Sequence, residues 1–245
     1  MTDKVLDIQG LHAGYDGVAV VRDLDLYVAP GEVVAFLGPN GAGKTTTLMA
    51  VSGMVEILAG SITVLGHPVP KLRQAHLVAR WGVSHVPENR GILFQLTVEE
   101  NLHLAKRGSR IDVTPALEFF PALKPLLKRR AGLLSGGEQQ MLAIGRAILS
   151  EPDFLMIDEM SLGLAPVIYE ELMPIVRKIA DGTGAGVLLV EQHADLALAQ
   201  SDRGYVLNHG DLVMQGTAAE LIRDRDLLDA TYLGGETLEE EQPLI

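Results

Sequence analysis

The chain has 245 residues, 47% of them hydrophobic, and contains no cysteine. This length suits one α/β domain with room for an inserted subdomain, and the apolar fraction excludes a disordered or fibrous protein. The net charge of −12 argues against a protein that binds the nucleic-acid backbone, and the lack of cysteine excludes disulfides and thiolate metal sites.

The first part of the chain predicts an antiparallel hairpin and then a buried strand. Apolar and polar residues alternate in VLDIQGL and in VVRDLDLYV, with the Gly-containing AGYDG between them. From Glu32, EVVAFLG is almost entirely apolar and ends in glycine, which is typical of a parallel strand buried on both faces. Farther along, GSITVLG and WGVSHVPE predict strands, and KLRQAHLVAR predicts a helix.

Residues from about 89 to 150 are mostly helical in pattern, which predicts a helical insertion. TVEENLHLAK begins with a Thr-x-x-Glu cap, and Pro121 and Pro125 break TPALEFFPALKPLLKRR into short pieces. The stretch LLSGGEQQMLAIGRAIL predicts a longer helix that opens with two glycines, and its Ser135 and Glu138 have the spacing of a capping box.

Strands and helices alternate again after residue 150. DFLMID and GVLLVEQ predict buried strands, VIYEELMPIVRKIA and ADLALAQ predict helices, and RGYVLNHG, DLVMQG and TAAELIRD predict two strands and a last helix. This alternation predicts an α/β fold with a mainly parallel sheet, whose ligands lie at the carboxyl ends of the strands. The acidic end, TLEEEQPLI, predicts a poorly ordered tail.

One loop has the pattern of a phosphate-binding site. GPNGAGKTT satisfies G-x-x-x-x-G-K-[ST] and lies between a buried strand and a helix, as that motif requires. Its glycines let successive backbone N–H groups surround phosphate oxygens, Lys44 would bridge the outer phosphates, and the Thr45 hydroxyl is placed to bind Mg²⁺. The loop residues expected to bind a nucleotide are Gly38, Pro39, Asn40, Gly41, Ala42, Gly43, Lys44, Thr45 and Thr46.

Acidic and basic side chains follow two other predicted strands. In FLMIDE, Asp158 suits a magnesium contact, and Glu159 can accept a proton from the attacking water or orient it. His193 follows a further buried strand and could reach the same edge of the sheet. We therefore expect Lys44, Glu159 and His193 to be the catalytic residues.

The start of the helix at Ser135 has two interpretations. Unpaired N–H groups at a helix start attract anions, and Gly136 and Gly137 would let an anion come close. A Ser-x-x-Glu sequence before an apolar run is also ordinary helix capping. Since the loop at Gly38–Thr46 already supplies one phosphate site, a second one needs its own reason.

GPNGAGKTT, LSGGEQQ, FLMIDE and the His of VEQH occur in this order, and with them the chain resembles an ATP-binding-cassette ATPase along nearly its whole length. The resemblance implies a P-loop NTPase (RecA-like) core with an N-terminal antiparallel β subdomain and an inserted helical subdomain. It also implies a head-to-tail pair of cassettes, in which Ser135, Gly136 and Gly137 of one chain meet the γ-phosphate of ATP held by the other. P-loop kinases and GTPases share the first motif but have no LSGG helix.

The same resemblance assigns further roles and domain limits. Tyr15 matches the aromatic residue that stacks on adenine, although a tyrosine at a hairpin tip needs no such role, and His193 matches the histidine that contacts the γ-phosphate. SLGLAP, residues 161–166, matches the segment that crosses the dimer interface.

We expect one ATPase domain over residues 1–235, with its core at about 1–88 and 151–235 and its helical subdomain at about 89–150. An acidic tail over 236–245 completes the chain.

Three residues depart from the family pattern. Glu88 stands where a glutamine is usual, and it can accept hydrogen bonds or approach Mg²⁺ but cannot donate as an amide does, so we count it among the nucleotide- and metal-binding candidates. Met160 stands where many relatives have proline, and Ala165 where many have an interface aspartate. The changes at Glu88 and Ala165 put the usual roles of those positions in doubt.

VPE, LTVEENL, LSGGEQQ and SLGLAP together look like the ATPase subunits of branched-chain amino acid importers, particularly the shorter of the two such subunits. Subunits that drive urea or amide uptake share much of this pattern, so the solute stays open.

The apolar residues Ile92, Leu93, Phe94 and Leu96 would either line a groove for a permease helix or seal the helical subdomain onto the core.

The expected cofactors are ATP and Mg²⁺, and the expected partners are proteins. They are a second cassette, identical or different, integral membrane permease subunits and, indirectly, a periplasmic or extracellular solute-binding protein, with no nucleic acid. Because no run approaches the ~18 apolar residues of a membrane span and MTDKVLDIQG lacks a signal-peptide core, we expect the chain at the cytoplasmic face of the membrane, held there by the permease.

Two other classes of protein stay open at this point. A cassette ATPase acting on DNA or the ribosome usually adds coiled-coil arms, zinc modules or a second cassette, and this sequence has none of these. A small-molecule P-loop kinase would require LSGGEQQ to be only a helix cap.

Overall fold

The computed structural model describes residues 4–71, 74–106 and 111–228, and the larger of its two sheets has six strands. These strands are β3 (Val33–Leu37), β6 (Val83–Val86), β7 (Phe154–Asp158), β8 (Gly186–Glu191), β9 (Arg203–Asn208) and β10 (Asp211–Thr217). They lie in the order β10-β9-β3-β8-β7-β6, and all pairs are parallel except β10 with β9. This mainly parallel sheet with helices confirms the predicted P-loop NTPase fold class.

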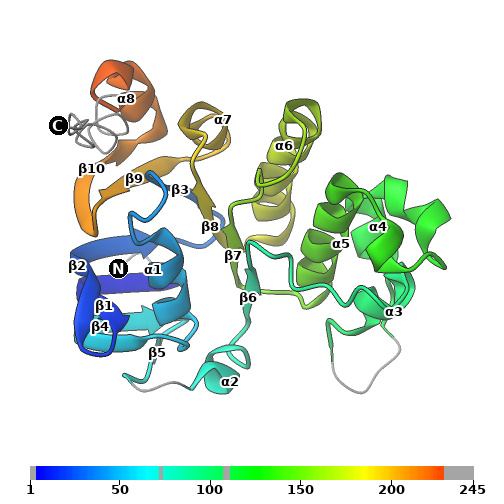
Figure 1. The fold of residues 1–245 in the computed structure, drawn as a ribbon, viewed down its shortest axis with the longest axis horizontal. Helices are drawn as coiled ribbons and strands as arrows, with labels where there is room; N and C mark the ends of the chain where they lie inside the picture. The colour runs from blue at the N-terminus through cyan, green and yellow to red at the C-terminus, as the bar shows by residue number, and fades with distance from the viewer. Residues whose placement is uncertain (1–3, 72–73, 107–110, 229–245) are drawn as a thin grey trace, which may run out of the picture.

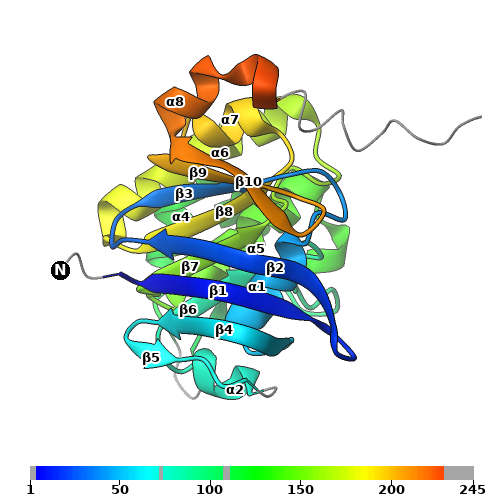
Figure 2. The same ribbon diagram turned by 90° about the vertical axis from the view of Figure 1, so that its left-hand side faces the viewer.

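The N-terminal strands form a second, antiparallel sheet in the order β2-β1-β4-β5. Its strands are β1 (Leu6–Tyr15), β2 (Val18–Val28), β4 (Glu56–Val64) and β5 (His67–Pro68). Asp16 and Gly17 join β1 to β2 with φ of 50° and 78°, as a two-residue hairpin turn of type I′ requires. The predicted hairpin is therefore confirmed, and Figure 2 shows this sheet stacked against the larger one with α1 (Lys44–Val51) beside it.

The central strands of the six-stranded sheet, β3, β7 and β8, are buried on both faces because their residues alternate between two hydrophobic cores. In β3, Val33, Ala35 and Leu37 pack into the core shared with the helices, whereas Val34 and Phe36 pack into the core shared with the antiparallel sheet. All five side chains are fully buried. A strand enclosed in this way has no polar face, which explains the continuous apolar run in EVVAFLG.

Most of the helices form two groups around the larger sheet (Figure 1). One group covers a face of the sheet and comprises α6 (Pro166–Thr183), α7 (Ala194–Leu198) and α8 (Ala218–Arg223). The other lies beyond β6 and comprises α3 (Val98–His103), α4 (Thr114–Phe119), α5 (Gly136–Leu149) and the 3₁₀ helices η1 (Pro121–Leu126) and η2 (Ala131–Leu133). The helical periodicity breaks at Pro121 and Pro125 as predicted, since both prolines lie in η1.

The helix predicted in KLRQAHLVAR is shorter than expected. Helix α2 covers only Ala75–Val78, and its N-cap Gln74 makes no side-chain cap hydrogen bond. The carbonyl of Lys71 accepts a hydrogen bond from the amide of Ile57 (3.3 Å), so the start of the predicted segment pairs with β4 instead. Backbone pairing with a neighbouring strand outweighs a weak local helix preference here.

Among the helices within the described ranges, none combines the length and apolar character that crossing a bilayer requires. The predicted acidic tail at 236–245 lies outside the described residues.

Candidate active site

The loop between β3 and α1 depends on glycines at two positions. Gly38 has φ of 150°, and a Cβ atom there would lie 2.2 Å from the carbonyl oxygen of Leu207. Gly43 is the N-cap of α1 with φ of 105°, and a Cβ there would lie 2.9 Å from Val21. Only glycine fits both the backbone angle and the space, so the loop can curl tightly at the end of β3.

Lys44 places its ammonium group inside this loop. The side chain is 4% exposed, and its Nζ donates hydrogen bonds to the carbonyl oxygens of Gly38 (2.7 Å) and Pro39 (3.0 Å). The same nitrogen lies 3.4 Å from Oε1 of Glu159. Burial lowers the pKa of Lys44, and the Glu159 carboxylate is the main group that opposes this change. The loop therefore presents a fixed cation beside a carboxylate.

A pocket of about 350 Å³ gathers most of the predicted nucleotide-binding residues. It is lined by Tyr15, Val20, Asn40, Gly41, Ala42, Gly43, Lys44, Thr45, Thr46, Glu88 and Glu159. Four separate segments of the chain meet here: the hairpin tip, the glycine loop, the loop after β6 and the end of β7. Tyr15 is half exposed at the mouth of this pocket, with its hydroxyl directed to the sulfur of Met49 (3.6 Å).

Asp158 and Thr45 have the chemistry of a magnesium site. The Thr45 hydroxyl interacts favourably with the Asp158 carboxylate, while Oδ1 of Asp158 is buried with no hydrogen-bond partner in the described part of the chain. Burial raises the pKa of Asp158 to about 6, and the charges of Glu159 and Glu88 act in the same direction. A cation bound at this oxygen would supply the contact that it lacks and would reduce the repulsion between Asp158 and the carboxylates of Glu159 and Glu88.

The number of protein ligands at this place also suits Mg²⁺. Within residues 4–228, apart from the undescribed gaps, no cluster of three or more His, Asp or Glu side chains could hold a metal. Mg²⁺ in nucleotide sites typically takes one or two protein oxygens and completes its shell with phosphate and water. The residues present therefore fit Mg²⁺ delivered with a nucleotide.

Glu159 is held by a residue that sequence reasoning missed. Its Oε1 accepts a hydrogen bond from Nε2 of Gln192 (3.1 Å), and the same Nε2 lies 2.6 Å from Oδ1 of Asn40. Gln192 thus joins the carboxylate at the end of β7 to the glycine loop. The one available signal in the sequence was its place directly before His193 at the end of a buried strand.

His193 lies at the same edge of the sheet but does not line this pocket. It is the N-cap residue of α7, its side chain is exposed, and its ring lies 5.8 Å from the ring of Tyr169, tilted by 48°. The contact with a γ-phosphate that the family resemblance implies therefore stays a prediction.

A buried carboxylate holds the segment SLGLAP. Glu191 is fully buried at the end of β8, and it accepts hydrogen bonds from the amide (3.1 Å) and hydroxyl (2.8 Å) of Ser161. Burial raises the pKa of Glu191 to about 7. Sequence reasoning missed this residue as well. In the same region, Met160 is fully buried in the hydrophobic core, which accounts for an apolar residue there, and Ala165 is the N-cap of α6.

The capping box predicted at the start of α5 is confirmed. Ser135 Oγ accepts a hydrogen bond from the Glu138 amide (3.3 Å), and Glu138 Oε2 accepts one from the Ser135 amide (2.7 Å). Gly137 packs so closely on α6 that a Cβ would lie 2.6 Å from Cγ2 of Ile168. Ser135, Gly136 and Gly137 do not line the pocket, and Figure 1 shows α1 and α5 on opposite sides of β6 to β8.

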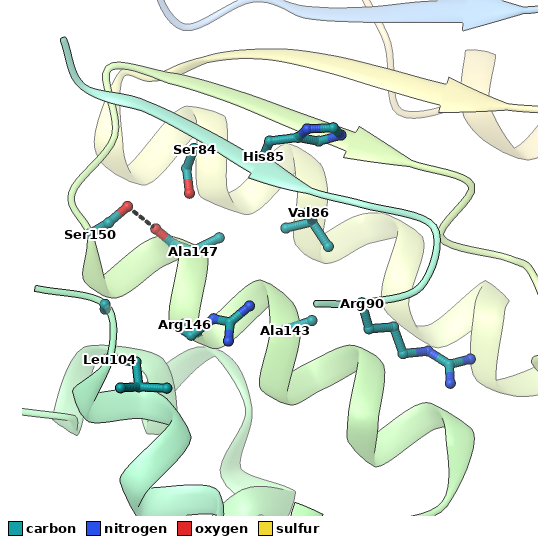
Figure 3. Close-up of a pocket in the computed structure, with 10 residues that line it drawn as sticks. Ser84, His85, Val86, Arg90, Leu104, Ala143, Arg146, Ala147 and Ser150 are labelled. Atoms are coloured by element: carbon teal, nitrogen blue, oxygen red, sulfur yellow. Dashed lines mark hydrogen bonds between the residues drawn. The ribbon is translucent and has the colours of Figure 1, made fainter. Parts of the chain in front are cut away.

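The four apolar residues after Glu88 were expected either to line a groove for a permease helix or to seal the helical subdomain onto the core, and they differ in exposure. Ile92 is buried in the core, whereas Leu93 and Phe94 are 51% and 53% exposed, and Leu96 is partly buried. Beside them a second pocket of about 150 Å³ lies between β6 and α5 (Figure 3). Arg146 lines it, donates a hydrogen bond to the carbonyl of Gly91 (2.8 Å), and has a pKa lowered by burial.

Comparison with known proteins supports one family. The profile of the ABC transporter family matches residues 21–161. The chain is 42% identical to the high-affinity branched-chain amino acid transport ATP-binding protein BraG of Pseudomonas aeruginosa, over 90% of this chain and 96% of BraG. It is 35% identical to the probable branched-chain amino acid transport ATP-binding protein LivF of Archaeoglobus fulgidus, over 86% of this chain and 92% of LivF.

The fold is also found among solved structures. CbiO1 of Clostridium perfringens, part of the ABC transporter complex cbiONQ, superposes with a TM-score of 0.81 over 93% of this chain and 94% of CbiO1, at 21% identity. Because the family profile covers more than half of the sequence and BraG aligns along almost all of it, this chain belongs to the ABC transporter family of ATP-binding proteins.

Proposed function

We propose that this chain is the ATP-hydrolysing subunit of an importer of branched-chain amino acids. Its family membership makes it an ATPase. The observation that carries the proposal is the pocket where Tyr15, the glycine loop, Glu88 and Glu159 meet. The solute class rests on the likeness to BraG and LivF, both named as branched-chain amino acid transport proteins.

The pocket has a place for each part of ATP. Tyr15 at its mouth offers an aromatic face to adenine, and the amide groups from Asn40 to Thr46 lie along the path of the phosphates. Lys44 already holds its ammonium group within the loop, so it needs little rearrangement to contact the outer phosphates. Thr45 and Asp158 would hold Mg²⁺, with Glu88 close by, and this ion would neutralise charge on the phosphate oxygens.

Glu159 is the proposed proton acceptor. Its carboxylate faces the pocket, and Gln192 and Lys44 hold it in place. In hydrolysis it would accept a proton from the water that attacks the γ-phosphorus, while the bond to the bridging oxygen breaks. His193, at the neighbouring strand end, would contact the γ-phosphate from outside the pocket that the single chain forms.

A second cassette completes the proposed site. The start of α5, with Ser135, Gly136 and Gly137, has the free N–H groups of an anion site but lies away from the pocket of its own chain. In a head-to-tail pair, this helix start of each chain would meet the ATP held by the other. The exposed Leu93 and Phe94 would contact a membrane permease, which would hold the chain at the cytoplasmic face and receive solute from an external binding protein.

The first test is Glu159→Gln in the purified chain. Removal of the proton acceptor should lower the rate of phosphate release by about 10²- to 10⁴-fold, and MgATP should still bind. At saturating MgATP this variant should sediment as a dimer, because the hydrolysis that reopens the pair is blocked. If Glu159→Gln binds MgATP but stays monomeric, the proposed head-to-tail pairing around ATP is wrong.

The second test addresses the solute. The chain is reconstituted in proteoliposomes with the permease and binding protein encoded beside it, and uptake of labelled leucine and labelled urea is compared. Leucine uptake that needs internal MgATP and stops with Glu159→Gln is the expected result. Uptake of urea alone would reject branched-chain amino acids and leave the ATPase assignment standing.

A further inference from the structure

Arg90 joins three segments that are far apart in the sequence. It lies two residues after Glu88 in the loop that follows β6, and its backbone has φ of 64°. Its Nε donates to Oε1 of Gln140 (3.2 Å), and its Nη1 donates to Oε1 of Gln139 (2.9 Å). Its Nη2 donates to the carbonyl of Leu162, in the SLGLAP segment (3.1 Å). Figure 3 shows the side chain extending from this loop toward the beginning of α5.

The start of α5 and the SLGLAP segment touch at the end of this side chain. A Cβ on Gly136 would lie 3.3 Å from the carbonyl oxygen of Gly163 and 3.7 Å from Nη2 of Arg90. A Cβ on Gly163, where φ is 70°, would also lie 3.7 Å from that Nη2. The guanidinium therefore fills the space beneath two glycines and sets the distance between the two segments.

The positive charge of Arg90 is not neutralised by an acid. All three acceptors are neutral oxygens, and among the ion pairs of the described residues none includes Arg90. Glu138 is the acidic residue in the first turn of α5, and its carboxylate accepts the hydrogen bond of the Ser135 amide. The charge of Arg90 thus adds to the positive end of the helix dipole beside Ser135.

We propose that Arg90 is a positioning residue for the pairing of two cassettes around ATP. It holds the start of α5 against the SLGLAP segment in the arrangement that the partner's γ-phosphate meets, and it adds positive charge there. Because Arg90 lies on the loop of Glu88, which lines the chain's own pocket, it links that pocket to the surface offered to the partner. The inference rests on the function proposed above.

The guanidinium is suited to this role by its shape. Its planar fork supplies donors in three directions at once, whereas the ammonium of lysine is a single point on a flexible stem. Lysine at this position would keep the charge but could not reach Gln139, Gln140 and Leu162 together. Comparing arginine, lysine and methionine therefore separates the positioning role from the charge alone.

The test uses the full chain carrying Glu159→Gln. Arg90→Met and Arg90→Lys are added to it separately, and Arg80→Met serves as the matched control, since Arg80 is exposed near α2 and its side chain makes no hydrogen bond or ion pair within the described ranges. Binding of a fluorescent ATP analogue is measured at chain concentrations too low for pairing. The dissociation constant of the ATP-loaded dimer is then measured by sedimentation.

Analogue binding should change by less than about twofold in every variant, since Arg90 does not line the pocket. The dimer should be about tenfold weaker with Arg90→Met and at least about threefold weaker with Arg90→Lys, while Arg80→Met leaves it unchanged. Dimers of normal affinity with Arg90→Met, or complete rescue by Arg90→Lys, would overturn the inference. If the Glu159→Gln chain does not pair even with Arg90 intact, both this inference and the proposed function are wrong.

A second variant covers the case in which Arg90→Met does not fold. Gln139→Met removes one acceptor of the same fork and by itself should weaken the dimer, and where Arg90→Met folds, the double variant completes a mutant cycle. The two changes should be clearly less than additive in their effect on the dimer.

Steady-state kinetics give a further readout. In the Arg90 and Gln139 variants that keep Glu159, kcat for ATP should fall while KM stays within about twofold. Additive effects, or equal losses in ATP binding and in pairing, would show a merely structural role and reject the inference.

Discussion

Glu191 and Gln192, adjacent residues at the end of β8, hold two different loops of the site. Glu191 accepts the hydrogen bonds of Ser161, and Gln192 donates to Glu159 and Asn40. Glu191 is the last residue of β8 and Gln192 follows it, and side chains of successive extended residues point to opposite sides, so neighbours in sequence can contact separate segments. A change at either residue should therefore disturb a different loop.

The buried carboxyl of Glu191 should make stability depend on pH. Burial raises its pKa from 4.5 to about 7, so between these values the folded chain keeps a proton that the unfolded chain has released. The contribution of this group to stability is therefore full below about pH 4.5 and is lost as pH rises to about 7. Glutamine keeps a side chain that can pair with Ser161 but has no proton to lose.

We expect Glu191→Gln to gain stability relative to the parent chain as pH rises through this range, by up to about 3 kcal/mol. Urea unfolding from pH 4.5 to 8 measures the difference. Tyr169 and Glu159 also face Glu191, so the control is Glu118→Gln at an exposed glutamate, which should track the parent chain. A difference between Glu191→Gln and parent that does not vary with pH would contradict the expectation.

At the scale of elements, three helices in this chain begin with the same capping box. Thr97 caps α3, Ser135 caps α5 and Thr217 caps α8, each with a glutamate three residues later that completes the box. All three make the two reciprocal hydrogen bonds of the box, so the box by itself does not mark α5 as an anion site. The start of α5 differs in its two glycines, in its packing against α6, and in that the Thr97 and Thr217 hydroxyls also donate to their glutamates.

These three boxes allow the two interpretations of Ser135 to be separated. Aspartate caps helices as well as serine or threonine does, so Ser135→Asp, Thr97→Asp and Thr217→Asp should each change the free energy of unfolding by less than about 1 kcal/mol. Only Ser135→Asp places a negative charge where a partner's γ-phosphate is expected. We expect it alone to abolish ATP-dependent pairing in the Glu159→Gln chain, as measured by sedimentation. Pairing that survives would return Ser135 to a capping role.

The elements also show where local pattern succeeds and where it fails. Strands such as β3 and β7 were predicted from unbroken apolar runs, because enclosure on both faces leaves no other composition. The helix α5 was predicted from its cap and its periodicity. The helix in KLRQAHLVAR is shorter than predicted, since Lys71 pairs with Ile57 of β4, a partner 14 residues earlier that no local pattern reveals.

At the scale of the whole molecule, the chain carries two separate half-sites. The pocket at α1 and the start of α5 lie on opposite sides of β6 to β8 (Figure 1). If each ATP is shared between chains, a defect in one half-site of one chain can be compensated by a partner with a defect in the other. The predicted division into a core at about 1–88 and 151–235 and a helical subdomain at about 89–150 stays a prediction.

Mixing two inactive variants tests this arrangement. Lys44→Ala disables the pocket, and Ser135→Asp disables the helix start, so neither chain should hydrolyse ATP alone. A mixed pair contains one site built from the intact halves of both chains. With random pairing, the mixture should regain about a quarter of the parent's sites, measured as phosphate release. A mixture as inactive as its components would argue against shared sites.

The sequence by itself determined the α/β class, the strand–loop–helix at Gly38–Thr46, the acidic pair after β7 and the capping box of α5. These features depend on residues close together in the chain, where backbone geometry and side-chain periodicity act directly. The tertiary structure alone decided that Gln192 holds Glu159, that Glu191 holds Ser161, and that Arg90 joins α5 to SLGLAP. These contacts bridge separations of 30 to 72 residues, and they arise from how the strand ends and loops meet in space.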